Sequence, residues 1–106
     1  VNLRGKNGAT PAFFAALEGQ TAALELLVKA GCDVKRADED GRTPAHAAAY
    51  QGHAAALALL VKAGCDLDIA DNDGWTPAFI AAGKGQTAAL KFLVKAGCDV
   101  NQKAKD

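Results

Sequence analysis

Three cysteines stand out first, because thiols can bind zinc or form disulfides. Cys32, Cys65 and Cys98 are separated by a constant 33 residues, whereas zinc sites in sequences use closely spaced Cys or His pairs. If each thiol belongs to one of three stacked units, neighbouring thiols lie roughly 8–10 Å apart. That exceeds the roughly 7 Å Cα separation that a disulfide tolerates. We therefore expect three small, buried, unpaired side chains and no metal.

Two histidines are the remaining candidates for acid–base chemistry. Neither His46 nor His53 has a partnering Ser or Cys in a recognisable motif. A nucleophilic mechanism would also need an orienting group and an oxyanion pocket. The sequence thus predicts no catalytic residue and no enzymatic activity.

Two short motifs resemble ligand sites without the context that such sites need. Gly83–Ala88 has the pattern G-x-G-x-x-A of a dinucleotide fingerprint, but the fingerprint follows a strand, and a helix is expected here. The run 71–74 resembles part of a calcium loop. With Gly74 as its sixth residue, the first and twelfth ligands would be Ile69 and Ile80, which carry no side-chain oxygen. We expect no cofactor.

Charge and hydropathy exclude several classes of partner. The 12 basic and 12 acidic residues cancel, so no overall field attracts nucleic acid or an anionic membrane. The longest apolar run, Ala54–Val61, is far shorter than the roughly 20 residues of a spanning helix. With cysteines that do not pair, the composition predicts a soluble protein of the reducing cytoplasm.

The chain repeats itself with a period of 33 residues. Over the 27 positions from Gly8 to Val34, the third copy is identical to the first at 21, which is typical of a solenoid. Thr-Pro pairs at 10–11, 43–44 and 76–77 recur in register with the cysteines. We expect one domain with repeats at about 1–33, 34–66 and 67–99, and residues 100–106 as a tail or the start of a further hairpin.

Each unit contains the signals of a turn and two helices. Thr followed by Pro favours a helix start, and Gly19, Gly52 and Gly85 favour its end. A second helix is predicted over 21–30, 54–63 and 87–96, where Leu and Val follow a 3.6-residue period. Turn-forming residues at 39–41 and 72–74 predict tight hairpin tips.

The segment Asp38–Ala48, together with Gly52-His53 and Leu59–Asp66, resembles the ankyrin repeat, and the resemblance extends over the whole chain. It implies an all-α repeat solenoid of hairpin, helix and helix that binds proteins through a concave face. It also implies a hydrogen bond from His46 to the Thr43 hydroxyl, and contacts from His53 to the neighbouring hairpin backbone. Asn101 resembles the hairpin asparagine that intracellular hydroxylases modify.

The core is expected to be built from small side chains. Of the 106 residues, 25 are alanine, so helices can approach closely while each residue buries little area. We expect the phenylalanines to fill the remaining gaps in the core; these are Phe13, Phe14, Phe79 and Phe92.

Positions that differ between the copies form the candidate partner-binding surface. They follow the hairpin glycine, end the first helix or form the tips: Lys6, Asn7, Ala9, Leu17, Glu18, Glu39, Asp40, Arg42, Tyr50, Gln51, Asn72, Asp73, Trp75 and Lys84. We predict that Trp75, Tyr50 and Arg42 are exposed anchors, since aromatic and Arg side chains dominate protein recognition. The acidic tips favour a partner with basic and apolar patches.

A structural scaffold without an external ligand is the alternative. Solenoids normally have terminal repeats with a polar outer face, and neither end of this chain has one. Both ends resemble parts of further repeats, which suggests a piece of a longer array that could also associate end to end. The near-identity of the copies fits design and recent duplication equally.

Overall fold

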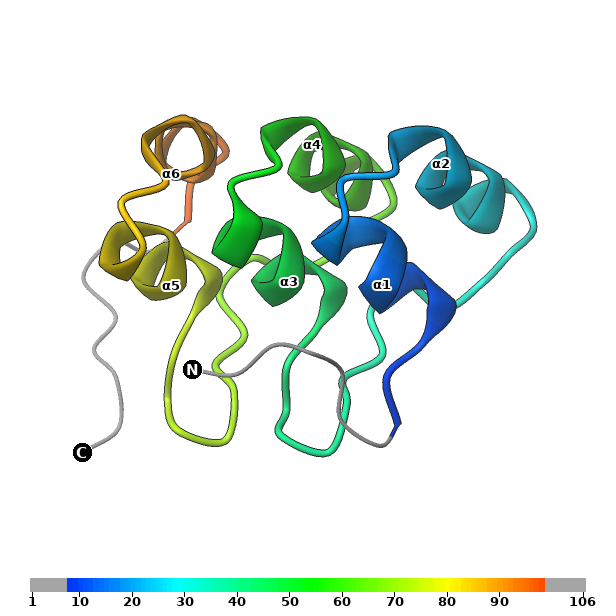
Figure 1. Ribbon diagram of the computed structural model, residues 1–106, viewed down its shortest axis with the longest axis horizontal. Coiled ribbons are helices and arrows are strands. Elements are labelled where there is room, and N and C mark those ends of the chain that lie inside the picture. Colours follow the sequence, from blue (N-terminus) through cyan, green and yellow to red (C-terminus); the bar gives the residue numbers. More distant parts are fainter. Residues whose placement is uncertain (1–7, 99–106) are drawn as a thin grey trace.

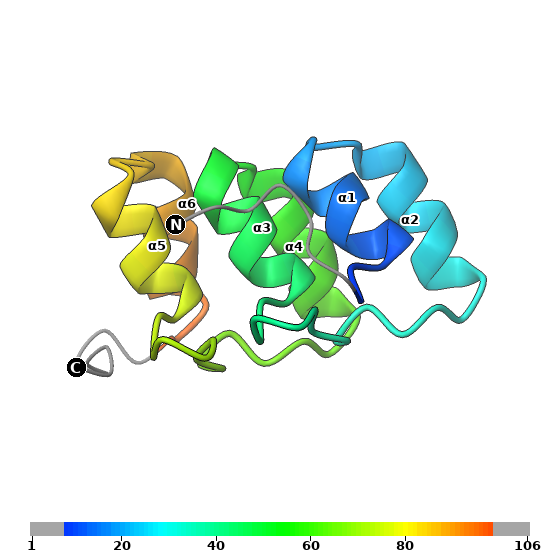
Figure 2. The ribbon, with the colours of Figure 1, turned by 60° about the horizontal axis from the view of Figure 1, so that its bottom comes forward.

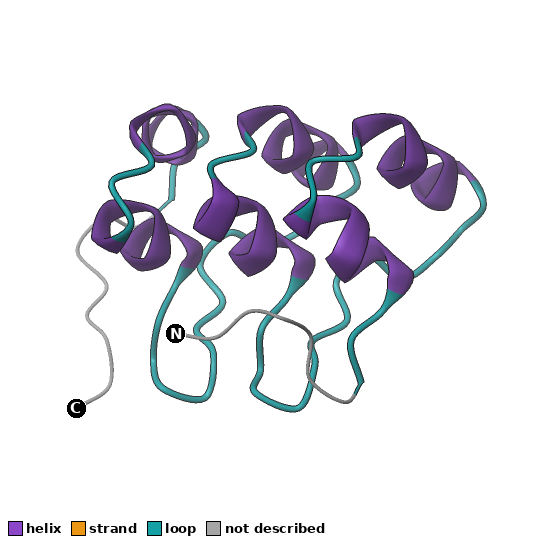
Figure 3. Cartoon of the chain, viewed as in Figure 1, coloured by secondary structure: helices purple, strands orange, loops and turns teal. Residues whose placement is uncertain are grey.

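The computed structural model describes residues 8–98, which form three helix pairs in two layers (Figure 1). The first helices α1 (Pro11–Leu17), α3 (Pro44–Gln51) and α5 (Pro77–Gly83) make one layer, and the second helices α2 (Thr21–Lys29), α4 (Ala54–Lys62) and α6 (Thr87–Lys95) make the other. Turning the molecule shows the three pairs in the same order along the stack (Figure 2). No strand occurs within residues 8–98 (Figure 3).

The Thr-Pro pairs start the first helices as the sequence predicts. The hydroxyl of Thr10 accepts a hydrogen bond from the Phe13 amide at 3.2 Å, and Thr76 accepts one from the Phe79 amide at 3.3 Å. In each case Pro occupies the next position, where its missing N–H costs no hydrogen bond. The same short motif therefore sets the start of every first helix.

Glycines in the left-handed conformation end the helices. Gly52 closes α3 with φ of 76°, and Gly64 follows α4 with φ of 90°; these values are strained for any residue with a Cβ. The chain then turns back sharply into the next element. The helix ends predicted from glycine are confirmed, with the second helices stopping one residue before the predicted alanine.

The core is made mainly of leucine and alanine. Leu24, Leu57 and Leu93 are fully buried, one from each second helix. Phe13 is buried as predicted, but the prediction of a core position for Phe14 is wrong, because its side chain is 44% exposed. In α3 almost every residue is buried, since this helix has a neighbour on both sides.

His46 joins the second repeat to the third. Its Nδ1 lies 3.0 Å from the Thr43 amide and 2.9 Å from the Thr43 hydroxyl, which confirms the predicted Thr43 contact. Its Nε2 lies 2.8 Å from the carbonyl oxygen of Trp75. A carbonyl can only accept and an amide can only donate. The ring is therefore neutral, with its proton on Nε2, and its burial lowers its pKa.

Other polar side chains also bond to the main chain of the preceding repeat. Asn72 donates its side-chain amide to the Glu39 carbonyl at 2.9 Å, and Gln86 donates to the Tyr50 carbonyl at 2.9 Å. The prediction that His53 contacts hairpin backbone is wrong. Its ring instead lies against Gly19 at the end of α1, so closely that a Cβ there would come within 2.7 Å.

The tips are held by buried aspartates. Asp38 Oδ1 accepts from the amides of Asp40 at 2.8 Å and Arg42 at 3.0 Å, and Asp71 Oδ1 accepts from the amides of Asp73 and Trp75, both at 2.9 Å. These bonds fix the turn that each tip makes. The predicted tips at 39–41 and 72–74 are confirmed as turns.

Arg42 was predicted to be an exposed anchor, and the structure contradicts this. The residue is only 5% exposed. Its Nε lies 3.5 Å from Asp71 Oδ2, and its Nη1 lies 3.4 Å from Asp40 Oδ2. Separating the guanidinium from the buried carboxylate would leave a buried charge without a counter-charge, which would lower the free energy of unfolding. Arg42 therefore links two tips and is not available to a partner.

None of the three cysteines forms a disulfide within the described residues. The expectation that they are buried is wrong for Cys32, which is exposed, while Cys65 and Cys98 are half-buried. Cys65 is partly covered by the segment that links α2 to α3, where its Sγ donates to the Val34 carbonyl at 3.5 Å. Within residues 8–98, none of the helices combines the length and apolar character needed to cross a bilayer.

We predict that His46 makes the stability depend on pH. Its pKa is lowered in the folded chain, so the unfolded chain takes up a proton first as the pH falls below the ordinary value of about 6.5. The free energy of unfolding, measured with urea, should be highest above pH about 6.5 and should fall progressively towards pH 5. His46→Phe, which copies Phe13 and Phe79, should remove this fall. His53→Gln, which copies Gln20 and Gln86, should keep it; the reverse pattern would refute the assignment.

Removing Arg42 should destabilise the chain strongly. Arg42→Ala leaves the buried Asp71 carboxylate without its cation, a loss of about 3 kcal/mol in the free energy of unfolding. Arg36→Ala, which removes an exposed arginine of the same segment, is the matched control and should unfold close to the parent. Equal urea midpoints for the two variants would show that the Arg42 pair contributes nothing.

The first repeat lacks the same ion pair, and supplying it should stabilise the fold. Asp38 Oδ2 is buried and has no hydrogen-bond partner among the described residues, and Ala9 stands where the next repeat has Arg42. Ala9→Arg should raise the free energy of unfolding by about 1 kcal/mol. In a double-mutant cycle the gain should vanish with Asp38→Asn; a gain that persists would place the effect elsewhere.

Candidate functional site

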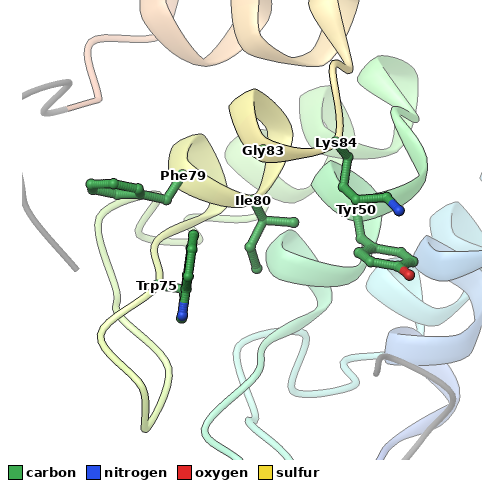
Figure 4. Close-up of a pocket in the computed structure, with 6 residues that line it drawn as sticks. All are labelled: Tyr50, Trp75, Phe79, Ile80, Gly83 and Lys84. Carbon is green, nitrogen blue, oxygen red and sulfur yellow. The ribbon is translucent and has the colours of Figure 1, made fainter. Parts of the chain in front are cut away.

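A groove lies between α3 and α5 and opens on the layer of first helices (Figure 4). Its volume is about 180 Å³, and it is lined by Tyr50, Trp75, Phe79, Ile80, Gly83 and Lys84. Most of this lining is apolar or aromatic. The groove therefore suits an apolar side chain that a partner inserts, with a cation at one edge.

The tip and the buried histidine position Trp75. Its amide donates to Asp71 Oδ1 at 2.9 Å, and its carbonyl accepts from His46 Nε2 at 2.8 Å and from the Asp71 amide at 2.8 Å. The main chain is thus fixed on both sides while the indole is half-buried. Its ring meets Phe79 edge to face, with centroids 5.7 Å apart. Such packing holds an aromatic surface ready before any partner arrives.

Tyr50 and Lys84 form the opposite side of the groove. Tyr50 lies at the end of α3, and the Lys84 ammonium sits 4.9 Å from the centre of its ring (Figure 4). This is a cation–π contact, and Lys84 remains exposed. The lysine can therefore pair with an acidic group of a partner while its stem covers the tyrosine.

Gly83 leaves the groove open. Its equivalents in the other two repeats are Leu17 and Tyr50. A Cβ built at Gly83 meets no atom within 4 Å, and the residue ends α5 without a positive φ. The missing side chain thus creates space between Tyr50 and Trp75, and the backbone does not require glycine there.

The tips next to the groove carry negative charge. Glu39 and Asp73 are exposed, while Asp40 is half-buried beside Arg42. Asn72 is exposed but is held by its bond to Glu39. Because Arg42 is paired with aspartates, the accessible charge of the two described tips is acidic.

Only some of the residues predicted for the partner-binding surface lie together in the structure. It brings Tyr50, Trp75 and Lys84 into one groove. Ala9 is half-buried, while Glu18 and Gln51 are exposed at the ends of the first helices. Leu17 is 7% exposed and packs in the core, so its predicted exposure is wrong; an apolar side chain at a helix end turns inward. Lys6 and Asn7 lie outside the described residues.

Sequence reasoning missed three residues of the groove. Phe79 was assigned to the core, whereas it is half-buried beside Trp75. Ile80 and Gly83 were not chosen as site residues. The sequence did mark Ile80 and Gly83 as variable, because each position differs between all three copies. The equivalents are Phe14, Ala47 and Ile80 at the first position, and Leu17, Tyr50 and Gly83 at the second.

The other chemical candidates give no site. Burial raises the pKa of the Cys65 thiol, which keeps it protonated and weakly nucleophilic. Within residues 8–98, no three His, Cys, Asp or Glu side chains are grouped as a metal ion would need. Gly83–Ala88 follows a helix and not a strand, as expected. Asn101 lies outside the described residues.

Comparison with known proteins agrees with this architecture. A family model described as ankyrin repeats, in three copies, matches residues 12–104. No curated protein matches the chain. Ankyrin repeats are generally non-enzymatic modules of protein–protein interaction. The matched segment covers most of the sequence and all three helix pairs apart from the first residue of α1, so the chain belongs to the ankyrin repeat family.

Proposed function

We propose that this chain is a non-enzymatic interaction module that binds a partner protein through the groove between α3 and α5 and the adjoining tips. The observation that carries the proposal is an aromatic groove of about 180 Å³ in which every lining residue except Phe79 differs from its equivalents in the other two repeats. Residues that repeat without change build the scaffold, whereas the variable residues that line this groove are not needed by the repeat itself.

The anchors have the properties of recognition residues. Trp75 and Tyr50 present half-buried aromatic surfaces, which bind with little loss of side-chain entropy because the scaffold already holds them. Gly83 provides the space that a partner's side chain would fill. The groove is small, so we infer that a partner inserts one apolar side chain or a short segment of chain.

Charge limits the chemistry of the partner. Glu39 and Asp73 at the tips favour basic side chains, while Lys84 at the groove favours one acidic group. A partner that presents an apolar residue between a basic patch and a carboxylate would match both. Three cysteines that form no disulfide within the described residues support placing this interaction in the cytoplasm.

The test uses a variant that closes the groove without disturbing the fold. Gly83→Leu inserts the residue found at the same position of the first repeat, Leu17. The immobilised parent should capture a partner from a cell lysate. The purified partner should then bind Gly83→Leu and the Tyr50→Ala/Trp75→Ala double variant at least about tenfold more weakly, as expected when hot-spot contacts are lost.

Ala88→Leu is the matched control, because it adds the same side chain at an exposed position outside the groove lining. It should bind as the parent does. Trp75 is the only tryptophan, so its fluorescence emission should also shift when the partner binds. A partner that binds Gly83→Leu and the parent equally, with no change in emission, would exclude the groove as the binding surface.

A further inference from the structure

Apolar side chains are exposed at the two ends of the stack. Residues at several of the same repeat positions are covered where another repeat packs against them. At the start of the chain, Phe14 is 44% and Leu26 is 70% exposed, and Ala23 is exposed as well. In the third repeat, the equivalents of Phe14 and Ala23 are covered by the second repeat, since Ile80 is 3% exposed and Ala89 is fully buried, while Phe92, the equivalent of Leu26, is half-buried. We call Phe14, Ala23 and Leu26 the first-repeat face.

The opposite end shows the complementary pattern. Phe79 and Leu90 are half-exposed, whereas Phe13 and Leu24 are buried at the same positions of the first repeat. Val94 is 51% exposed. A hollow of about 440 Å³ lies over α6 between Leu90, Val94 and the lysines Lys91 and Lys95. We call Phe79, Leu90 and Val94 the third-repeat face.

At the third-repeat end, no described side chain fills the space above the glycine that follows the first helix, whereas a polar side chain of the next repeat fills it elsewhere in the stack. The His53 ring fills the space above Gly19, and the Gln86 amide fills the space above Gly52, where a Cβ would come within 2.5 Å of it. The equivalent Gly85 has no atom within 4 Å of a Cβ position. The residue that corresponds to His53 and Gln86 is Gln20, which is exposed at the start of α2.

We propose that the third-repeat face of one molecule packs on the first-repeat face of a second copy of this chain, head to tail. This contact places Phe14 and Leu26 of one copy against Phe79 and Leu90 of the other, as α3 and α4 pack on α1 and α2 within the stack (Figure 2). Gln20 then fills the space above Gly85 and donates to the Gly83 carbonyl, as Gln86 donates to that of Tyr50. The contact goes beyond the proposed function, and the two surfaces share Phe79, which lines the groove and also belongs to the third-repeat face.

A second copy fits these faces because neighbouring repeats within the chain already pack on one another through the same pair of faces. The contact between the second and third repeats uses the same helical positions, with the apolar residues Ile80 and Phe92 in place of Phe14 and Leu26. Over the whole unit, 21 of 27 compared positions are identical between the first and third copies. Because the contact joins two different surfaces, each added copy again exposes a free third-repeat face. Association is therefore open-ended and extends the stack.

Two charge variants test the proposal. Leu26→Glu should block the first-repeat face and Val94→Glu the third-repeat face, and both side chains are exposed enough for the fold to tolerate the change. By sedimentation, the parent should form dimers, trimers and larger species up to about 1 mM, the range of a weak interface. Each variant alone should stay monomeric. Their equimolar mixture should form a one-to-one dimer and nothing larger, since one functional face remains on each.

Ala55→Glu, at an exposed position of the middle repeat, is the control and should associate as the parent does. A parent that stays monomeric up to about 1 mM would overturn the proposal. So would a parent that stops at the dimer, which would indicate a symmetric contact, or a variant mixture that stays monomeric. Far-ultraviolet circular dichroism would show that the single variants remain helical.

Discussion

Each helix pair of this protein can bury its apolar side only against the next pair, and the rest of the structure follows from that constraint. The helices that meet at this contact carry fully buried alanines, among them Ala47, Ala48 and Ala56. Small side chains let the backbones approach closely. Side chains of one repeat can then reach the main chain of its neighbour, as Asn72 and Gln86 do.

The polar groups at this contact position the groove. His46 donates to the main-chain carbonyl of Trp75, and Asp71 accepts from the main-chain amides of Asp73, in the tip, and of Trp75. Arg42 balances the charge of Asp71 in a buried environment. Buried polar networks of this kind specify one arrangement, because any shift leaves a group without its partner. The aromatic surface above them is therefore held in place before binding.

The groove and the ends of the stack differ in what creates them. The groove exists because one repeat carries Trp, Ile and Gly where its neighbours carry other residues. The exposed ends arise from position: Phe13 and Phe79 are the same residue at the same helical position, yet among the described repeats only Phe13 is covered by a following one. Local sequence variation therefore creates the groove. The apolar end faces are exposed because no further described repeat packs on them.

Much of the fold could be predicted from the sequence because its signals are local. The Thr-Pro caps, the closing glycines and the Thr43–His46 contact all involve residues within a few positions of one another. The site was predicted only in part. Comparing the copies selected Tyr50, Trp75 and Lys84. Ile80 and Gly83 also differ between the copies but were not chosen, and Phe79 was assigned to the core, since their contribution to the groove depends on the repeat that lies beside them.

The sequence by itself determined the repeating unit, its helix ends and the positions where copies diverge, because capping and turn formation depend on neighbours along the chain. The tertiary structure decided which copy of each position is covered. It buried Arg42 and Leu17 and exposed Phe14 and Cys32. The physical reason is that burial and ion pairing are set by the adjacent repeat, which differs for the first, middle and last copy even where the residues are identical.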